Sequence, residues 1–329
     1  MKQIEVLAPA KINLFLKIVN KRIDGFHDLE TVFEKVSLFD KLTLKEVKGE
    51  NIVLTSNSRR VPLNKDNTVY KAIELVRDKF KIKRGISVHI EKNIPQRAGL
   101  GGGSSDAVAA LRGINELWRL GLSTDDMLDF AKQIGSDVAL FVLKDSFLLG
   151  KGRGERLTPI RVAKGLKLWH ILITPNFGIS TPLAYHLFDK HFMLRSSTEK
   201  ALRLKLTIPD YSANIITHAL FNRDVSLLNY YSYNSFAGFL FKDFPRLASI
   251  KKSLEEILFD TSTASSCGKK RRSVSTLSFC RRVDFIHVSG SGPTLFLTFS
   301  GRKEASETLS KIEKRLEKDR CQSFLVHTN

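Results

Sequence analysis

The sequence predicts an α+β protein of two domains. Runs with a period of two, which indicate strands, alternate along the 329 residues with helical patterns of period three to four. A new apolar strand is predicted at residues 168–174, and the chain then ends in strand–strand–helix–strand order. This order favours mixed layers, with a ferredoxin-like second half. Because a chain of this length commonly divides in two, we expect domains at residues 1–165 and 166–329.

The first half opens with a predicted strand at residues 4–18, in which apolar and polar side chains alternate. Because of this alternation, Lys11 and Asn13 point to the same side of the strand. A polar turn at residues 21–27 follows, with Gly25 as its breaker. The other predicted elements of this region are strands at 42–46, 52–55 and 86–90 and a helix at 68–79.

A segment rich in glycine and serine, residues 95–107, leads into a helical pattern that runs to Trp118. A helix start offers unpaired N–H groups and the positive end of a dipole, and glycine lets the backbone approach an anion. The segment therefore predicts a phosphate-binding loop, the alternative being an ordinary turn with a serine cap. It is not a Walker A loop, because no Lys precedes the hydroxyl, nor is it the dinucleotide-binding fingerprint.

Further helix starts lie beyond this loop. Ser123 and Asp126 form a capping box for a helix that stops at Gly135. Thr181 and Pro182 have the residue types of an N-cap and a first turn. The remaining predictions are strands at 147–150, 168–174, 285–288, 294–299 and 323–327, short helices up to 258 including one from 245, and a helix at 302–318.

The chain carries a formal net charge of +19, which is typical of proteins that meet nucleic acid, anionic membranes or polyphosphates. The basic residues are spread along the chain and lack the aromatic signature of RNA binders, so we expect a solvated basic surface. No apolar run is long enough for a membrane span, so no membrane partner is expected. The basic segment near 259–282 is interpreted as a solvated insertion, with nuclear-localisation or anion-binding roles as alternatives.

The number and spacing of the cysteines indicate the cellular compartment. Cys267, Cys280 and Cys321 are odd in number and widely spaced, which indicates neither a zinc site nor a disulfide framework. The N-terminus shows no clear targeting segment. We therefore expect a cytoplasmic protein, or one of a plastid-like compartment in a eukaryote. The sequence makes no prediction of oligomeric state.

Several segments together resemble the GHMP small-molecule kinases over residues 8–299. Pro9-Ala-Lys-Ile-Asn-Leu14 is similar to the first motif of that family, and Ser289-Gly-Ser-Gly-Pro-Thr294 to the third. The glycine loop, Gly99-Leu-Gly-Gly-Gly-Ser-Ser-Asp106, is similar to the second motif. Together with residues 24–33, it most resembles the branch that acts on 4-diphosphocytidyl-2-C-methyl-D-erythritol. Residues 152–155 and 175–185 match the middle of that branch.

The resemblance implies a two-domain architecture with a ribosomal S5 domain 2-like N-terminal domain and a ferredoxin-like C-terminal domain. It implies ATP- and Mg²⁺-dependent phosphorylation of the 2-hydroxyl of this substrate, in the non-mevalonate route to isoprenoid precursors. One alternative is a GHMP kinase for homoserine, mevalonate or a sugar, and another is a catalytically silent relative. From a different class, a basic nucleic-acid-binding protein remains an alternative, because the first domain resembles a ribosomal-protein domain.

The resemblance also implies the catalytic pair. Asp137 would act as general base on the acceptor hydroxyl, and Lys11 would keep that carboxylate ionised and orient the hydroxyl. On sequence grounds alone, Asp137 would most often be a helix-start cap and Lys11 a surface lysine.

The loop would hold ATP, with Mg²⁺ at its end. Ser105 and Asp106 are the predicted metal ligands, although Ser104 is an alternative and Asp106 equally suits the first turn of a helix. The predicted ATP-binding residues are Pro95, Gly99, Leu100, Gly101, Gly102, Gly103, Ser104 and Ser105.

For the substrate, the resemblance implies that Asn13 binds the methylerythritol part. Phe26, His27 and Tyr185 would hold the cytosine ring by stacking and hydrogen bonds, although a tyrosine at helical spacing also suits a core. Phe26 stands where the branch usually has Tyr, and Ser235 stands where it commonly has Asp. These departures bear on substrate affinity rather than on the class of reaction.

Overall fold

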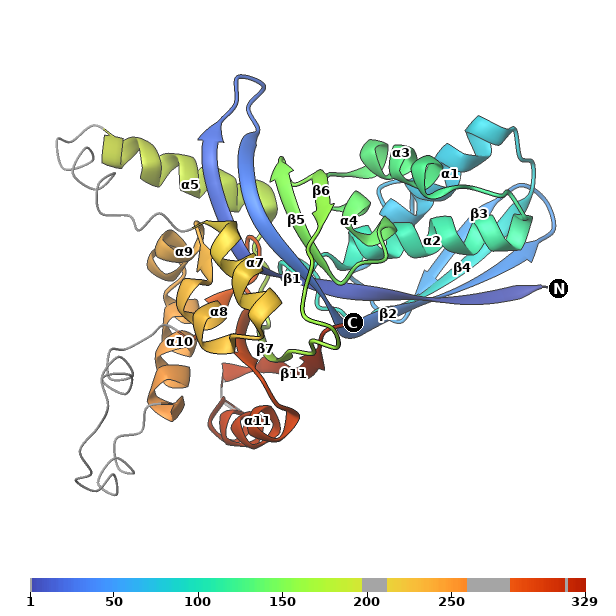
Figure 1. The fold of residues 1–329 in the computed structure, drawn as a ribbon. Helices are drawn as coiled ribbons and strands as arrows, with labels where there is room; N and C mark the ends of the chain where they lie inside the picture. Colours follow the sequence, from blue (N-terminus) through green and yellow to red (C-terminus); the bar gives the residue numbers. More distant parts are fainter. Residues whose placement is uncertain (1, 197–211, 259–284, 317–318) are drawn as a thin grey trace, which may run out of the picture.

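The computed structural model describes residues 2–196, 212–258, 285–316 and 319–329, folded around two β-sheets (Figure 1). The predicted insertion near 259–282, with two of the three cysteines, lies outside the described residues. The mixture of helices and sheets confirms the predicted α+β class. Among the described residues, none of the helices combines the length and the apolar character that crossing a membrane requires.

The larger sheet is built on two long antiparallel strands, β1 (Gln3–Lys21) and β2 (His27–Val47). Strand β2 pairs along one edge with β1, and along the other with β5 and then β4. The strand order is β3-β4-β2-β1-β8, with β5 and β6 attached beside β2. These further strands are β3 (Ile52–Ser56), β4 (Gly85–Glu91), β5 (Phe147–Gly152), β6 (Arg156–Pro159) and β8 (Tyr233–Asn234).

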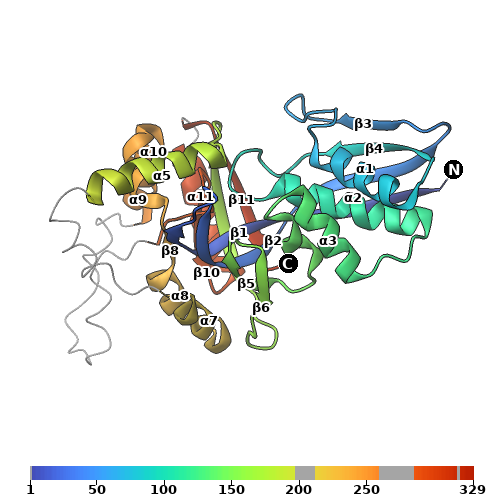
Figure 2. The ribbon, with the colours of Figure 1, turned by 90° about the horizontal axis from the view of Figure 1, so that it is seen from above.

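Four helices of the first half gather on one side of this sheet, as the two views in Figures 1 and 2 show. Helix α2 packs closely there: a Cβ atom at Gly113 would lie 2.6 Å from Leu44 Cδ1. The predicted capping box is confirmed, because Asp126 N–H donates to Ser123 Oγ at 3.1 Å and Ser123 N–H to Asp126 Oδ2 at 3.0 Å. The four are α1 (Thr68–Phe80), α2 (Gly102–Trp118), α3 (Thr124–Ile134) and α4 (Val138–Val142).

The smaller sheet belongs to the second half and is antiparallel at every pairing, in the order β11-β7-β10-β9. Its strands are β7 (Trp169–Pro175), β9 (His287–Val288), β10 (Leu295–Phe299) and β11 (Cys321–His327). In chain order this is the 4-1-3-2 arrangement of a ferredoxin-like sheet, as predicted. Its helices are α5 (Thr181–Ser196), α7 (Ala213–Asn222), α8 (Val225–Tyr231), α9 (Ala237–Asp243), α10 (Pro245–Leu258) and α11 (Arg302–Leu316).

The two halves lie side by side and share a hydrophobic core (Figure 2). Ile12 and Phe15 of β1 belong to the same buried cluster as Leu172 and Phe296 of the smaller sheet. Strand β8, from the second half, pairs in parallel with β1. Because strand β1 contributes to both halves, a side chain on it can contribute to a site formed by both. The proposed division at residue 165 stays a prediction.

Three departures from the sequence predictions concern local structure. Strand β2 begins at His27 rather than at residue 42, and most of its residues up to 36 are buried, so no alternation marks it. The short α4, β6 and β8 were not predicted. The N-cap prediction for Thr181 was wrong: α5 already includes Thr181, and Ser180 Oγ accepts from Leu183 N–H at 3.4 Å.

Candidate active site

A cavity of about 880 Å³ opens between the glycine loop, the turn that joins β1 to β2, and the start of α5. Of all the predicted site residues, only Ser105 does not line it. The glycine loop lies at one end, and Phe26, His27 and Tyr185 lie in the same cavity. The fold therefore brings together residues that the sequence places far apart.

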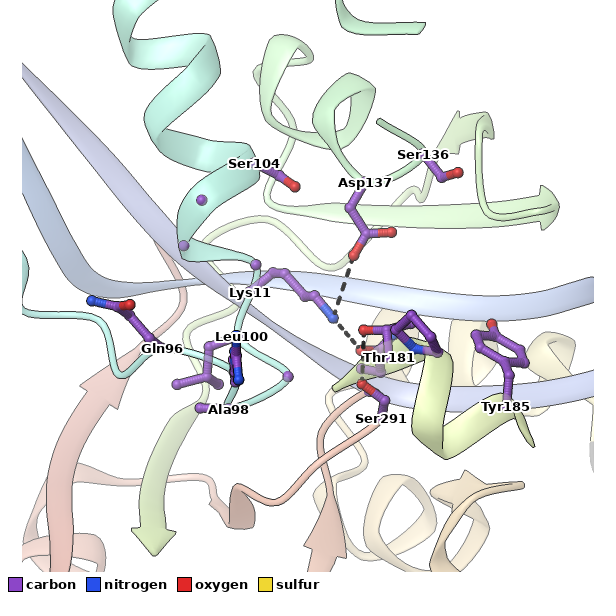
Figure 3. A pocket seen from close by; sticks show the side chains of 18 of the residues that line it. Lys11, Gln96, Ala98, Leu100, Ser104, Ser136, Asp137, Thr181, Tyr185 and Ser291 are labelled. Atoms are coloured by element: carbon purple, nitrogen blue, oxygen red, sulfur yellow. Dashed lines mark hydrogen bonds and ion pairs between the residues drawn. The ribbon is translucent and has the colours of Figure 1, made fainter. Parts of the chain in front are cut away.

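The Lys11 ammonium and the Asp137 carboxylate point toward one another across this cavity (Figure 3). Lys11 Nζ lies 3.9 Å from Asp137 Oδ2, with the Lys11 side chain only 5% exposed and that of Asp137 42% exposed. Asp137 stands at the N-cap position of α4, but its side chain caps no N–H group. Both structural alternatives are therefore wrong: Lys11 is not a surface lysine, and the Asp137 carboxylate is not a helix cap.

Lys11 is held by a chain of hydrogen bonds. Its Nζ donates to Asn13 Oδ1 at 2.7 Å, Asn13 Nδ2 donates to Thr31 Oγ1 at 2.8 Å, and Thr31 Oγ1 donates to the Phe15 carbonyl at 2.7 Å. This chain fixes the orientation of the Asn13 amide, with its oxygen toward Lys11. Burial lowers the pKa of Lys11, and the nearby Asp137 carboxylate opposes that shift.

The glycine loop presents bare N–H groups at the start of α2. Gly101 is the N-cap, with φ of 72°, and it provides no side-chain cap. Among the described residues, no group accepts a hydrogen bond from the N–H groups of Gly102, Gly103 and Ser104. These N–H groups and the helix dipole favour an anion at this end of the cavity.

Two positions of the loop, Gly99 beside the third motif and Gly101 beside α4, leave no room for a side chain. A Cβ atom at Gly99 would lie 2.2 Å from the Ser289 carbonyl oxygen, and one at Gly101 would lie 2.9 Å from the Phe141 ring. Ser289 Oγ also donates to the Gly99 carbonyl at 3.1 Å. The loop and the third motif therefore support each other through contacts that leave no room for larger residues.

A buried charge cluster lies behind the loop. Lys92 Nζ contacts Asp40 Oδ2 and lies 2.8 Å from Asp106 Oδ2, and all three side chains are nearly inaccessible. Burial alone would lower the pKa of Lys92, but its two carboxylate partners outweigh burial and raise it. Burial, only partly offset by Lys92, raises the pKa of Asp106 to about 7, and the Asp40 carboxylate adds to the rise.

Two polar atoms near the loop have no hydrogen-bond partner among the described residues: Ser105 Oγ and Asp106 Oδ1. Ser105 is 1% exposed, whereas Ser104 lines the cavity. No cluster of three or more His, Cys, Asp or Glu side chains in the described part of the chain could hold a metal ion. A cation at this site would therefore need ligands from a bound molecule as well.

The opposite end of the cavity is aromatic. The His27 and Tyr185 rings stack at 4.9 Å with an interplanar angle of 21°. Tyr185 also meets the Phe236 ring edge at 5.0 Å, so it is partly a core residue, and burial followed by the Asp137 charge raises its pKa. Phe26 is 52% exposed, and Arg153 Cζ lies 4.9 Å from its ring centroid. The three predicted aromatic residues thus gather as expected.

Comparison with known proteins identifies the family to which this chain belongs. Residues 67–145 match the family described as GHMP kinases N terminal domain. The 4-diphosphocytidyl-2-C-methyl-D-erythritol kinases of Geobacillus sp. (strain WCH70) and Bacillus cereus (strain B4264) are each 34% identical to this chain, over 88% of it and 86% of their own lengths. The chain belongs to the GHMP kinases, in the 4-diphosphocytidyl-2-C-methyl-D-erythritol kinase family.

Solved structures of GHMP kinases have the same architecture. A crystal structure of 4-(cytidine 5'-diphospho)-2C-methyl-D-erythritol kinase aligns with a TM-score of 0.70 and 25% identity, covering 99% of this chain and 100% of its own. A crystal structure of L. major mevalonate kinase in complex with R-mevalonate aligns with a TM-score of 0.67 and 16% identity, covering 99% of this chain and 95% of its own. The latter likeness extends to the fold alone.

Sequence analysis missed several residues that line the cavity of this kinase. Thr181 Oγ1 lies 3.2 Å from Ser291 Oγ, and both residues are on the cavity wall. Ser291 belongs to the third motif, which was a sufficient signal to include it. Arg153 also lies in a segment that resembles the family, residues 152–155. Lys92 and Asp189 had no such signal, because each contacts partners that are distant in the sequence.

The Ser235 departure from the family pattern has a structural account. Asn234 supports the third motif, since its Nδ2 donates to the carbonyls of Val288 at 2.7 Å and Gly290 at 2.8 Å. Ser235 Oγ accepts from Ile18 N–H at 2.9 Å, a contact that a carboxylate oxygen would also make. The serine therefore retains an acceptor at this position.

Proposed function

We propose that this kinase transfers the γ-phosphoryl group of ATP to the 2-hydroxyl of 4-diphosphocytidyl-2-C-methyl-D-erythritol. The observation that supports it best is the order of groups along one cavity: bare N–H groups, then the Lys11–Asp137 pair, then the aromatic rings. This order suits a substrate whose acceptor alcohol and cytosine ring are separated by a diphosphate. The second candidate is a kinase for homoserine, mevalonate or a sugar. None of these substrates has an aromatic base that would bind at the aromatic end of the cavity.

Phosphate binding, proton transfer and orientation of the acceptor hydroxyl would each be carried out by different residues. The N–H groups of Gly102, Gly103 and Ser104 bind the ATP phosphates. Asp137 accepts the proton of the 2-hydroxyl while that oxygen bonds to the γ-phosphorus and the bond to the β–γ bridging oxygen breaks, releasing ADP. Lys11, with Asn13 behind it, orients the hydroxyl and offsets the charge that develops.

The substrate is held by its two ends in this proposal. Phe26, His27 and Tyr185 stack on and hydrogen-bond the cytosine ring, and Asn13 contacts the methylerythritol part. Tyrosine is usual at position 26 in this family, but phenylalanine retains the stacking surface and loses only a hydroxyl.

The site fits Mg²⁺ at the end of the loop. Asp106 Oδ1 and Ser105 Oγ lack partners among the described residues, and oxygen ligands of this kind, completed by phosphates, suit Mg²⁺. Asp106, with Ser105 or Ser104, would hold the ion, which would neutralise phosphate charge. Lys92 keeps the Asp106 carboxylate in place beside the loop.

A coupled assay of ADP release tests the proposal. We expect turnover with 4-diphosphocytidyl-2-C-methyl-D-erythritol, little with homoserine, mevalonate or a hexose, and none after Mg²⁺ is removed by EDTA. Preferred turnover of another acceptor would replace the proposed substrate. No ATP consumption with any acceptor, together with salt-sensitive binding of nucleic acid, would support the nucleic-acid alternative instead.

A further inference from the structure

Asp189 joins the two halves of the molecule at the aromatic end of the cavity. It lies on α5, one helical turn after Tyr185, and lines the cavity. Asp189 Oδ1 lies 2.8 Å from His27 Nε2, and Asp189 Oδ2 accepts from Lys21 Nζ at 2.6 Å. One carboxylate therefore links the start of β2 and the end of β1 to α5.

This contact determines which His27 nitrogen carries hydrogen. Burial raises the pKa of Asp189, but its hydrogen bonds with Lys21 and His27 outweigh burial and keep the pKa low. An ionised carboxylate only accepts hydrogen bonds, so His27 Nε2 must carry the hydrogen. In a neutral ring Nδ1 is then an acceptor, and no described residue donates to it.

The orientation of the His27 ring is fixed as well. Its side chain is 5% exposed, one face stacks on Tyr185, and the Phe188 ring meets it edge-on at 5.9 Å and 90°. A ring packed in this way cannot exchange its two nitrogens by rotation. His27 lines the cavity, so Nδ1 is the ring nitrogen left for a ligand.

We propose that Asp189 is a positioning residue that holds His27 with Nδ1 as a hydrogen-bond acceptor, so that the site selects a pyrimidine with an exocyclic amine over one with a carbonyl. The inference rests on the proposed function. The amine of cytosine donates to such an acceptor, whereas the corresponding carbonyl of uracil cannot. A buried acceptor left unpaired beside uracil disfavours that base.

The chain offers a matched control for Asp189→Asn. Asp243 Oδ2 lies 2.7 Å from His191 Nε2 in an equivalent pair, and neither residue lines the cavity. We expect Asp189→Asn to raise KM for the cytidine substrate about tenfold and to reduce the preference over its uridine analogue about tenfold, with KM for ATP unchanged. Asp243→Asn should change none of these, and Asp189→Glu should restore part of the preference.

Nitrogen-15 NMR of histidine-labelled wild-type protein tests the tautomer without relying on turnover or on the folding of a variant. In the wild type we expect a single His27 tautomer, with hydrogen on Nε2 and none on Nδ1. In Asp189→Asn we expect a mixture of tautomers instead. An Nδ1–H tautomer in the wild type would overturn the inference, as would an unchanged cytidine preference in a folded Asp189→Asn. If the wild type phosphorylates neither nucleotide substrate, the proposed function fails, and the NMR result alone still decides the tautomer.

Discussion

Lys11 and Asp137 form an ion pair at 3.9 Å in the middle of the cavity, although they come from different layers of the fold. Lys11 lies on the first strand of the larger sheet and Asp137 lies directly before the short helix α4. The ammonium is buried and the carboxylate is partly open to the cavity. This asymmetry suits a carboxylate that meets substrate and an ammonium that positions it.

Asp137→Asn should reduce kcat by about 10²–10⁴, because the amide cannot accept the hydroxyl proton. ATP affinity should remain close to that of the wild type, since the loop N–H groups are untouched. Single-turnover kinetics and calorimetric titration with a non-hydrolysable ATP analogue measure the two effects separately. Asp129→Asn is the control, because this carboxylate is 65% exposed and pairs only with Lys132 in the described structure. Wild-type turnover in Asp137→Asn would remove this residue from the mechanism.

Gly102→Val should weaken ATP binding by at least about tenfold, equivalent to about 1.4 kcal/mol. A Cβ atom at Gly102 would lie 3.1 Å from both Lys92 Nζ and Ile94 Cγ2, so the loop must shift. Gly238→Val on α9 is the matched control, because nothing lies within 4 Å of a Cβ atom there. Equal ATP affinity in the two variants would show that the loop backbone does not hold the phosphates.

Phe26→Leu should raise KM for the cytidine substrate about tenfold with little change in kcat, because stacking of a base on an aromatic ring is worth about 1–3 kcal/mol. Phe26→Tyr keeps the ring and should behave like the wild type. Phe80→Leu removes another exposed ring, 42% accessible and outside the cavity, and should have no effect on KM. Steady-state kinetics with both substrates varied compares the four proteins, and an unchanged KM in Phe26→Leu would argue against stacking at this position.

The stability of the protein should depend on pH through Lys35. This side chain is 4% exposed and donates to the Leu143 carbonyl, and burial together with the positive charge of Arg112 lowers its pKa to about 8. Between pH 8 and the ordinary value of 10.5, the unfolded chain retains a proton that the folded protein has released. The free energy of unfolding therefore rises with pH across this window.

Lys35→Met removes that titration. Relative to this variant, the wild type should gain up to about 3 kcal/mol of stability as the pH rises through the window, because one pKa unit corresponds to about 1.4 kcal/mol. Urea denaturation of both proteins at several pH values measures the difference, and other titrating groups cancel in the comparison. Parallel stability curves would contradict the lowered pKa.

Much of the secondary structure could be predicted, because its signals are local. The capping box at Ser123 needs only two residues three apart, and the helix from Gly102 to Trp118 is marked by its own apolar spacing. The first part of β2 gave no such signal, since neighbours from both halves bury nearly all of residues 29–36. The two-residue strand β8 exists only because β1 lies beside it.

The sequence by itself predicts a phosphate-binding loop, because three consecutive glycines at the start of a helix have the same backbone freedom in any fold. It also determined the family, through motifs that keep their order along the chain. Only the tertiary structure decided that Lys11 is buried, that Lys92 lies between two carboxylates, and that Asp189 holds His27. Burial and charge pairing depend on which distant segments meet, and the spacing of neighbouring residues carries no information about such contacts.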